Sequence, residues 1–264
     1  MNHKEQLGFL TVACNTEQVD YLRLAYLQAV NIKKTQKNNL YAVIVDQHTL
    51  SSVTKDYEQV FDYIIEVPKH DFGPYGAEAF LFELTPFKET IKVESDLLFT
   101  RNIDHWINMF RLRDMMLSTG CRNYQQELSD VRKYRKIFDD NNLPDVYNGL
   151  MYFRFTKTAQ VFFDTAKQIF KEWNTVVNQL KNYRESVPTT DVVFALTAQI
   201  IGRELCTIPS ADFINFTHMK PAINGFNENL KFSEVFVTEH DGDMIRINNL
   251  NQYHPLHYYD KDFL

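Results

Sequence analysis

The run GFLTVAC, residues 8–14, is the first of three short apolar segments near the start of the chain, and YAVIV at 41–45 and YIIEV at 63–67 are the others. All three are rich in β-branched residues, which is typical of buried strands. The segments between them, 17–28 and 51–61, carry apolar residues at helical spacing and predict two helices. Strands that alternate with helices in this way indicate an α/β fold with a parallel sheet, because each helix returns the chain to the end of the sheet where the previous strand began.

The remainder of the chain predicts further strands and helices without a break between domains. Strands are expected at 147–155, 235–238 and 244–247, and helices are expected at 77–84, 111–136, 158–180 and 191–201. No internal repeat, low-complexity tract or linker separates these elements, so a single domain is expected.

The composition excludes several classes of protein. The chain has 264 residues, of which 44% are hydrophobic and 23% charged, as in folded globular proteins rather than disordered ones. Its net charge of −6 argues against general binding to polyanions, so contact with nucleic acid would need a local basic patch. No apolar run approaches the roughly 18 residues of a membrane span. Three widely spaced cysteines form no disulfide framework, and a cytoplasmic protein is therefore expected.

The most informative motif is Glu94-Ser95-Asp96, which directly follows the apolar run at 90–93. Two carboxylates separated by one residue lie on the same face of an extended chain. In open α/β sheets, ligands bind at the carboxyl ends of strands, and paired carboxylate oxygens suit Mn²⁺ or Mg²⁺. The alternative is a solvated loop with two unrelated acidic residues.

These carboxylates belong to a longer pattern, TPFKETIKVESDLL at 85–98. Three other segments follow: Asn148-Gly149 beside an expected strand, Asp191 at the start of an expected helix, and His257 followed four residues later by Lys261. With these residue types in this order, the chain resembles the nucleotide-sugar glycosyltransferases of the GT-A fold, especially their glycogenin-like branch. The resemblance spans most of the chain, and the carboxylate segment is its most specific part.

The resemblance implies a fold and a reaction. The fold would be a GT-A type α/β domain over residues 1–264, with a mostly parallel sheet flanked by helices and a smaller acceptor-side subregion. Residues 1–110 would bind the nucleotide sugar and the metal, and residues 111–264 would form the acceptor half and a closing tail. The reaction would be metal-dependent transfer of a sugar from a nucleotide sugar, foremost a UDP-sugar, to an acceptor hydroxyl.

The resemblance also implies roles for individual residues. Asp96, Glu94 and His257 would bind Mn²⁺ or Mg²⁺, and Lys261 would contact the diphosphate, where negative charge grows in the transition state. Asp191 and Asp96 are the expected catalytic residues, with Asp191 positioning or deprotonating the acceptor hydroxyl; the alternative for Asp191 is a helix cap. Glu94 departs from the family, in which aspartate is most usual.

Further contacts with the donor are implied around the first strand and the Asn-Gly pair. The residues concerned are Asn15, Thr16, Tyr21, Asp46, Asn148 and Gly149. The first three follow the first strand, where such proteins hold the base, and the alternative for them is a helix cap at Asn15-Thr16 and a core aromatic. A turn residue is the alternative for Asp46, and a tight turn for Asn148-Gly149.

The segment 111–136 has seven basic residues against three acidic ones. Basic residues interleaved with aromatic ones suit a phosphate backbone, so a hydroxymethylated base in DNA, as in bacteriophage DNA modification, is one acceptor considered. The contacts would come from Arg111, Arg113, Arg132, Lys133, Arg135 and Lys136. The alternatives are a solvated helical face here, and a polysaccharide or protein hydroxyl as acceptor.

Two other classes of function are weaker. A non-catalytic nucleotide or nucleic-acid binding module on the same fold would not need an intact metal site, so Asp96 and His257 count against it. A two-metal phosphohydrolase would need a second cluster of ligands, and the sequence offers no such cluster.

Overall fold

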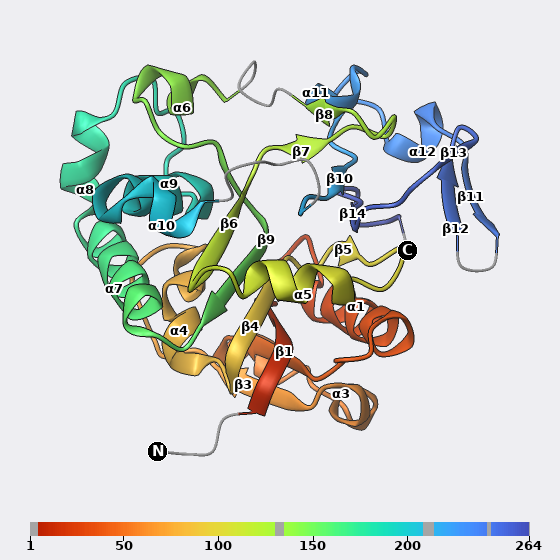
Figure 1. The fold of residues 1–264 in the computed structure, drawn as a ribbon, viewed down its shortest axis with the longest axis horizontal. Helices are drawn as coiled ribbons and strands as arrows, with labels where there is room; N and C mark the ends of the chain where they lie inside the picture. The colour runs from red at the N-terminus through yellow and green to blue at the C-terminus, as the bar shows by residue number, and fades with distance from the viewer. Residues whose placement is uncertain (1–4, 130–134, 208–213, 242–243, 264) are drawn as a thin grey trace.

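A mixed sheet forms the centre of the molecule in this computed structural model, which describes residues 5–129, 135–207, 214–241 and 244–263 (Figure 1). Within these residues the sheet has six strands, in the order β3 (Tyr63–Glu66), β2 (Tyr41–Val45), β1 (Glu5–Val12), β4 (Phe87–Val93), β9 (Val146–Arg154) and β6 (Met115–Thr119). The first four strands are parallel, and β9 is antiparallel to both of its neighbours. The α/β fold class predicted from the sequence is confirmed.

Helices cover both faces of this sheet (Figure 1). One face packs against α1 (Tyr21–Thr35), α3 (Lys55–Val60) and α5 (Asp104–Phe110). The other packs against η1 (Gly76–Phe80), α4 (Leu81–Leu84), α7 (Lys157–Lys171) and α9 (Thr190–Ile201). Short helices complete the connections: α2 (Gln47–Leu50), α6 (Lys136–Asp140), α8 (Trp173–Val176), η3 (Val177–Gln179), α10 (Arg203–Cys206), α11 (Pro221–Asn224) and α12 (Phe232–Val235). No helix in the described ranges is both long and apolar enough to cross a membrane.

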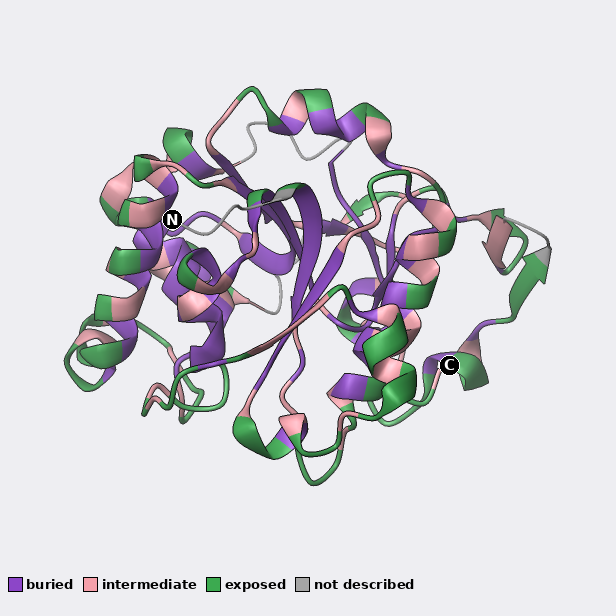
Figure 2. Cartoon of the chain, turned by 90° about the horizontal axis from the view of Figure 1, so that it is seen from below, coloured by how far each residue is buried: buried purple, intermediate pink, exposed green. Residues whose placement is uncertain are grey.

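The apolar strand sequences are explained by burial on both faces. In β2, Tyr41, Val43 and Val45 pack against the α1 side, whereas Ala42 and Ile44 pack against the α7 side. Figure 2 shows the same pattern, with a buried sheet inside helices whose outer faces are exposed. Burying one large apolar side chain contributes about 1.5–3 kcal/mol, so such strands need no polar face.

The order of the strands places a crevice between β1 and β4. From β1 the chain proceeds to β2 on one side, whereas β4 pairs with the opposite edge of β1. The chain segments that follow two such neighbouring strands lead away to opposite sides of the sheet, which leaves a crevice at the carboxyl ends of the two strands. Glu94 follows β4 at this end, and Ala13 follows β1.

A smaller sheet brings the end of the chain to this crevice. Its order is β5 (Leu97–Leu98), β14 (Leu256–His257), β10 (Thr217–His218), β7 (Cys121–Arg122) and β8 (Leu128–Ser129). Strand β14 lies between β5 and β10, with His257 opposite Leu97 on one side and His218 on the other. A third sheet, β11 (Thr238–Asp241), β12 (Met244–Ile247) and β13 (Leu250–Asn251), projects from the body (Figure 1).

The helix expected at 111–136 is wrong. The segment contains the strands β6, β7 and β8, and residues 130–134 lie outside the described residues. Strand β6 is buried and pairs with β9 along Met115–Leu117, so tertiary pairing decides its structure. The arginines on either side of β6 favoured the prediction of a polar helix, because its apolar run, Met115–Leu117, is only three residues long.

Two other expectations need correction. The strand expected at 235–238 is wrong for its first three residues, because α12 ends at Val235 and β11 begins only at Thr238. The Glu234 carboxylate accepts a hydrogen bond from the Lys231 amide at 2.6 Å, which fixes the start of this helical turn. The long helix expected at 158–180 is divided into α7, α8 and η3. Strands from both halves of the chain share the central sheet, and the division at residue 110 stays a prediction.

Gly149 lies inside β9 rather than in a turn, and we expect its replacement by alanine to destabilise the protein. A Cβ atom there would approach the Phe216 ring to 2.7 Å, and overpacking of this kind costs about 1–3 kcal/mol. The free energy of unfolding, from urea denaturation, measures the effect. Phe216→Leu in the Gly149→Ala background should restore part of the loss, because it removes the ring that clashes. An unchanged unfolding midpoint in Gly149→Ala would refute this packing.

Candidate functional site

The loop that carries Glu94, Ser95 and Asp96 is held by hydrogen bonds from three sides. From α1, the buried Gln28 amide donates to the carbonyl oxygens of Glu94 and Leu97, the latter at 2.6 Å. From β9, the Gly149 carbonyl accepts the Glu94 amide hydrogen at 3.1 Å, and from the tail the Tyr258 amide donates to the Asp96 carbonyl at 3.1 Å. The two carboxylates are therefore presented by a fixed backbone.

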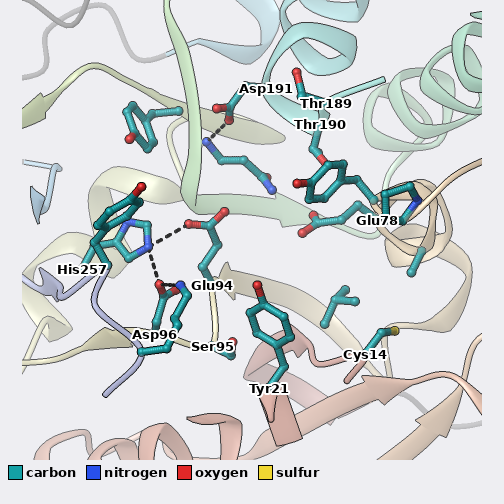
Figure 3. Close-up of a pocket in the computed structure, with 18 of the residues that line it drawn as sticks. Cys14, Tyr21, Glu78, Glu94, Ser95, Asp96, Thr189, Thr190, Asp191 and His257 are labelled. Carbon is teal, nitrogen blue, oxygen red and sulfur yellow. Dashed lines mark hydrogen bonds and ion pairs between the residues drawn. The ribbon is translucent and has the colours of Figure 1, made fainter. Parts of the chain in front are cut away.

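Both carboxylates converge with His257, and we call these three residues the carboxylate–histidine cluster. His257 Nε2 lies 2.9 Å from Asp96 Oδ2 and 3.3 Å from Glu94 Oε2 (Figure 3). One potential ligand atom from each residue lies within 4.8 Å of the others. The Lys261 ammonium also contacts Asp96 Oδ2. Asp96 and His257, which are 161 positions apart in the sequence, thus meet because β14 pairs with β5.

Opposite charges stabilise one another within this cluster. Burial alone would raise the pKa of Asp96, but His257 and Lys261 outweigh it and hold that pKa well below its usual range. Burial likewise opposes protonation of His257, yet Asp96 and Glu94 raise its pKa. For Glu94, burial dominates and raises the pKa, although His257 and Lys92 oppose it. Of the two carboxyl groups, that of Asp96 is therefore held more firmly in its charged form than that of Glu94.

The donor set of the cluster fits a divalent cation. Two carboxylates and one imidazole are suitable ligands for Mn²⁺, and carboxylates alone suit Mg²⁺. The atom of His257 that faces the carboxylates is Nε2, whose lone pair is free for a metal when the ring is neutral and its proton is on Nδ1. Stacking holds the His257 ring, since the His218 ring lies 4.2 Å away at an angle of 7°.

The cluster opens into a cavity of about 440 Å³ at the crevice between β1 and β4. Several residues expected from the sequence line it: Thr16, Tyr21, Glu94, Asp96, Asn148, Asp191, His257 and Lys261. Thr16 and Tyr21 come from the segment after β1, and Figure 3 shows Tyr21 directed toward the interior from the side opposite Asp191. Asn15, Asp46 and Gly149 are not among the lining residues.

Local structure accounts for two of these three. The Asn15 side chain accepts a hydrogen bond from the Leu22 amide at 2.8 Å, and Asp46 caps α2 by accepting from Thr49 at 2.7 Å. The N-cap of α1 is Asp20 rather than the expected Asn15-Thr16, although Asn15 also accepts from an amide in the first turn of this helix. Direct contact of Asn15 or Asp46 with a donor stays a prediction.

Asp191 and Asn148 form a bridge between α9 and β9. Asp191 Oδ1 accepts the Asn148 amide hydrogen at 2.6 Å, and Asp191 Oδ2 accepts from Arg135 at 3.1 Å. Asp191 is not the cap of α9, since Thr189 holds that position. It lies in the first turn of the helix, where the macrodipole favours an anion. Its carboxylate thus faces the cavity in a fixed orientation.

Sequence reasoning did not place three residues with charged or imidazole side chains that line the cavity. Glu78 comes from η1, and His218 and Lys220 come from the β10 segment. Burial and the neighbouring His257 lower the pKa of His218 well below its usual value, so this ring is neutral. The sequence does hold a sign of the pair between Glu78 and Lys92. Each is a charged residue within an otherwise apolar segment, GAEAF for Glu78 and TIKVE for Lys92.

The basic segment is largely engaged in internal contacts. Arg111 pairs with Glu89 at 2.8 Å, Arg113 donates to the Thr207 carbonyl at 3.0 Å, and Arg135 pairs with Asp191. Lys136 is exposed, and Arg132 and Lys133 lie outside the described residues. The described arginines therefore contribute to folding rather than to an open basic surface.

No protein-family model and no curated protein matches the chain by sequence. Similar solved structures include the apo form of mouse xyloside xylosyltransferase 1, which is 12% identical over 76% of this chain and 84% of that chain, with a TM-score of 0.46. The apo bifunctional glycosyltransferase WbbM is 12% identical over 89% of this chain and 44% of its own, with a TM-score of 0.47. The galactosyltransferase LgtC, solved with donor and acceptor sugar analogues, is 11% identical over 76% of this chain and 72% of its own, with a TM-score of 0.43.

Proposed function

We propose that the protein is a metal-dependent glycosyltransferase of the GT-A type, which transfers a sugar from a nucleotide sugar, foremost a UDP-sugar, to an acceptor hydroxyl. The observation that carries the proposal is the carboxylate–histidine cluster, joined by Lys261, at the carboxyl end of β4 in a cavity at the sheet's switch point. Three potential metal ligands, the Lys261 ammonium and a cavity of about 440 Å³ occur together there, as binding of a nucleotide sugar requires.

Each residue has a role that follows from its position. Glu94, Asp96 and His257 would hold Mn²⁺ or Mg²⁺, which supplies positive charge to the departing diphosphate. Lys261 and Lys220 line the same cavity and supply further positive charge where negative charge develops. Asp191, oriented by Asn148 and Arg135, would position or deprotonate the acceptor hydroxyl.

The cluster favours this reaction over two-metal hydrolysis. Among the residues that the structure describes, it is the single group of three or more histidine, cysteine or acidic residues that could hold an ion. Two-metal phosphohydrolases need a second set of ligands about 4 Å from the first ion. A non-catalytic nucleotide-binding module would differ from an enzyme in that it binds the nucleotide sugar without releasing the diphosphate from it.

A binding screen tests the proposal. ADP, CDP, GDP and UDP are added with and without Mn²⁺, and the melting temperature is recorded. We expect one diphosphate, foremost UDP, to raise the melting temperature only when Mn²⁺ is present, because bound ligands stabilise the native state by mass action. Release of the diphosphate from the matching nucleotide sugar then identifies an enzyme. The absence of any Mn²⁺-dependent shift would refute the proposal.

For the acceptor, we favour a saccharide hydroxyl over a base in DNA. The ion pairs of Arg111 and Arg135 support this choice, since those groups are not free to neutralise phosphates. A gel-shift experiment with duplex and single-stranded DNA at low salt is the test, because electrostatic binding is strongest there. We expect no complex. Binding that weakens steeply with salt would restore the DNA acceptor.

Replacing Asp191 with asparagine should reduce turnover of the donor by about a hundredfold while its affinity is kept. The amide cannot accept hydrogen bonds at both of its ends, so the contact with either Asn148 or Arg135 is lost. Diphosphate release from the nucleotide sugar and calorimetric binding are the measurements. Asp164→Asn, on the exposed face of α7, is the matched control. Full turnover in Asp191→Asn would remove this residue from the mechanism.

A further inference from the structure

A buried ion pair supports the cavity wall across from the carboxylate–histidine cluster: Glu78 lines the cavity, and Lys92 lies behind it. Lys92 Nζ lies 2.8 Å from Glu78 Oε1 and donates to the Asn148 carbonyl at 3.0 Å. Lys92 is fully buried in β4, between β1 and β9. Figure 3 shows the carboxylates of Glu78 and Glu94 directed into the same cavity from opposite sides. An unpaired buried ammonium costs several kcal/mol, so Lys92 requires both of its acceptors.

Two acceptor atoms beside this pair have no partner among the described residues. Glu78 Oε2 and Asn148 Oδ1 are both buried and make no hydrogen bond, and both residues line the cavity. A buried polar atom without a hydrogen bond costs about 1–3 kcal/mol. Lys92 contacts the other carboxylate oxygen of Glu78 and the backbone carbonyl of Asn148, so it connects the two residues whose side-chain acceptors are unpartnered. Two such acceptors in the lining of one cavity indicate a place that a ligand completes.

The chemistry of these atoms selects the group that would bind. Both are acceptors, so the ligand must donate hydrogen bonds, and the Glu78 carboxylate repels phosphate. The charge of Glu78 is already offset by Lys92, so a neutral donor suffices and a cation is not required. Hydroxyl groups of a sugar meet these requirements. Phosphate is better placed near Lys261 and Lys220 of the same cavity.

We infer that Glu78, held in place by Lys92, binds a hydroxyl of the transferred sugar, next to Asn148, whose contact with the donor the resemblance already implies. This inference rests on the proposed function and names a determinant of sugar recognition within it. Glu78 and Asn148 contact the sugar directly, whereas Lys92 is a positioning residue, since its ammonium orients the carboxylate and the Asn148 backbone. The sugar would thus lie between the cluster and this wall.

The test compares binding of a diphosphate with binding of its sugar ester, both with Mn²⁺ by calorimetry, using UDP and UDP-glucose for a uridine site. The first variant is Glu78→Leu combined with Lys92→Met, which removes the pair without leaving a buried charge. The second variant is Asn148→Ala, which keeps the backbone hydrogen bonds. The control is Glu83→Leu combined with Lys167→Met, an ion pair at the surface between α4 and α7.

Both cavity variants should weaken UDP-glucose by about tenfold or more and leave UDP within about twofold of wild type, as expected for lost hydrogen bonds to the sugar alone. The control should change neither affinity. Equal effects on UDP and UDP-glucose, or no effect on either, would overturn the sugar subsite while leaving the proposed function intact. If the wild-type protein binds neither UDP nor UDP-glucose, nor any other nucleoside diphosphate or its sugar ester, the proposed function fails and the subsite fails with it.

Discussion

Replacing Asp96 with asparagine is expected to abolish Mn²⁺-dependent binding of nucleoside diphosphates while the protein stays folded. Asp96 Oδ2 is the shared partner of His257 Nε2 and Lys261 Nζ, so the negative charge of this carboxylate organises the whole cluster. Asparagine keeps the shape but not the charge. We expect affinity for UDP with saturating Mn²⁺ to fall on the order of a hundredfold or more, because a bound ion contributes several kcal/mol of charge stabilisation.

The control for this variant is Asp104→Asn. Asp104 pairs with Lys37 at 3.3 Å in the first turn of α5, outside the cavity lining. Both variants should unfold cooperatively, and only Asp96→Asn should lose the Mn²⁺-dependent part of binding. Affinity near that of wild type in Asp96→Asn, at saturating Mn²⁺, would show that the ion is held elsewhere.

Strand β2 of the central sheet could be predicted because it is apolar on both faces, whereas β6 of the same sheet was expected to be helical. Residues 41–45 are a strand in the structure as in the prediction, since burial on both sides demands an unbroken apolar run. The short strands of the second sheet could not be predicted, because β5, β7 and β14 have two residues each. Periodicity needs more residues than that, and only pairing between distant segments defines such strands.

The candidate site was predictable where one segment carries the chemistry. Glu94 and Asp96 are recognisable from their spacing after a strand, and His257 was placed with them through the resemblance. The wall formed by Glu78 and Lys92 was not predictable, since its residues lie 14 positions apart on elements whose relative placement depends on the tertiary fold. Only the tertiary fold buries Lys92 behind Glu78 and brings Glu78 to the cavity.

The C-terminal tail is both a part of the core and a part of the site. Strand β14 pairs with β5 and β10, and Leu256 and Tyr258 are fully buried against Leu98 and Phe236. The tail is therefore held to the body by buried side chains of its own. Removal of residues 257–264 takes away Tyr258 along with His257 and Lys261. Loss of a large buried aromatic side chain costs about 3–5 kcal/mol, so this truncation should lower the melting temperature.

His257→Gln should separate the two roles of the tail. It leaves Tyr258 and the strand pairing in place but removes the imidazole that contacts Asp96 and Glu94. We expect a stable protein whose affinity for UDP with Mn²⁺ falls about a hundredfold, since one ligand of the ion is gone. His254→Gln is the matched control, because its ring contacts Gln126 at 2.9 Å and is outside the cavity lining. Equal affinities in the two variants would remove the tail from the metal site and leave it a purely structural role in the second sheet.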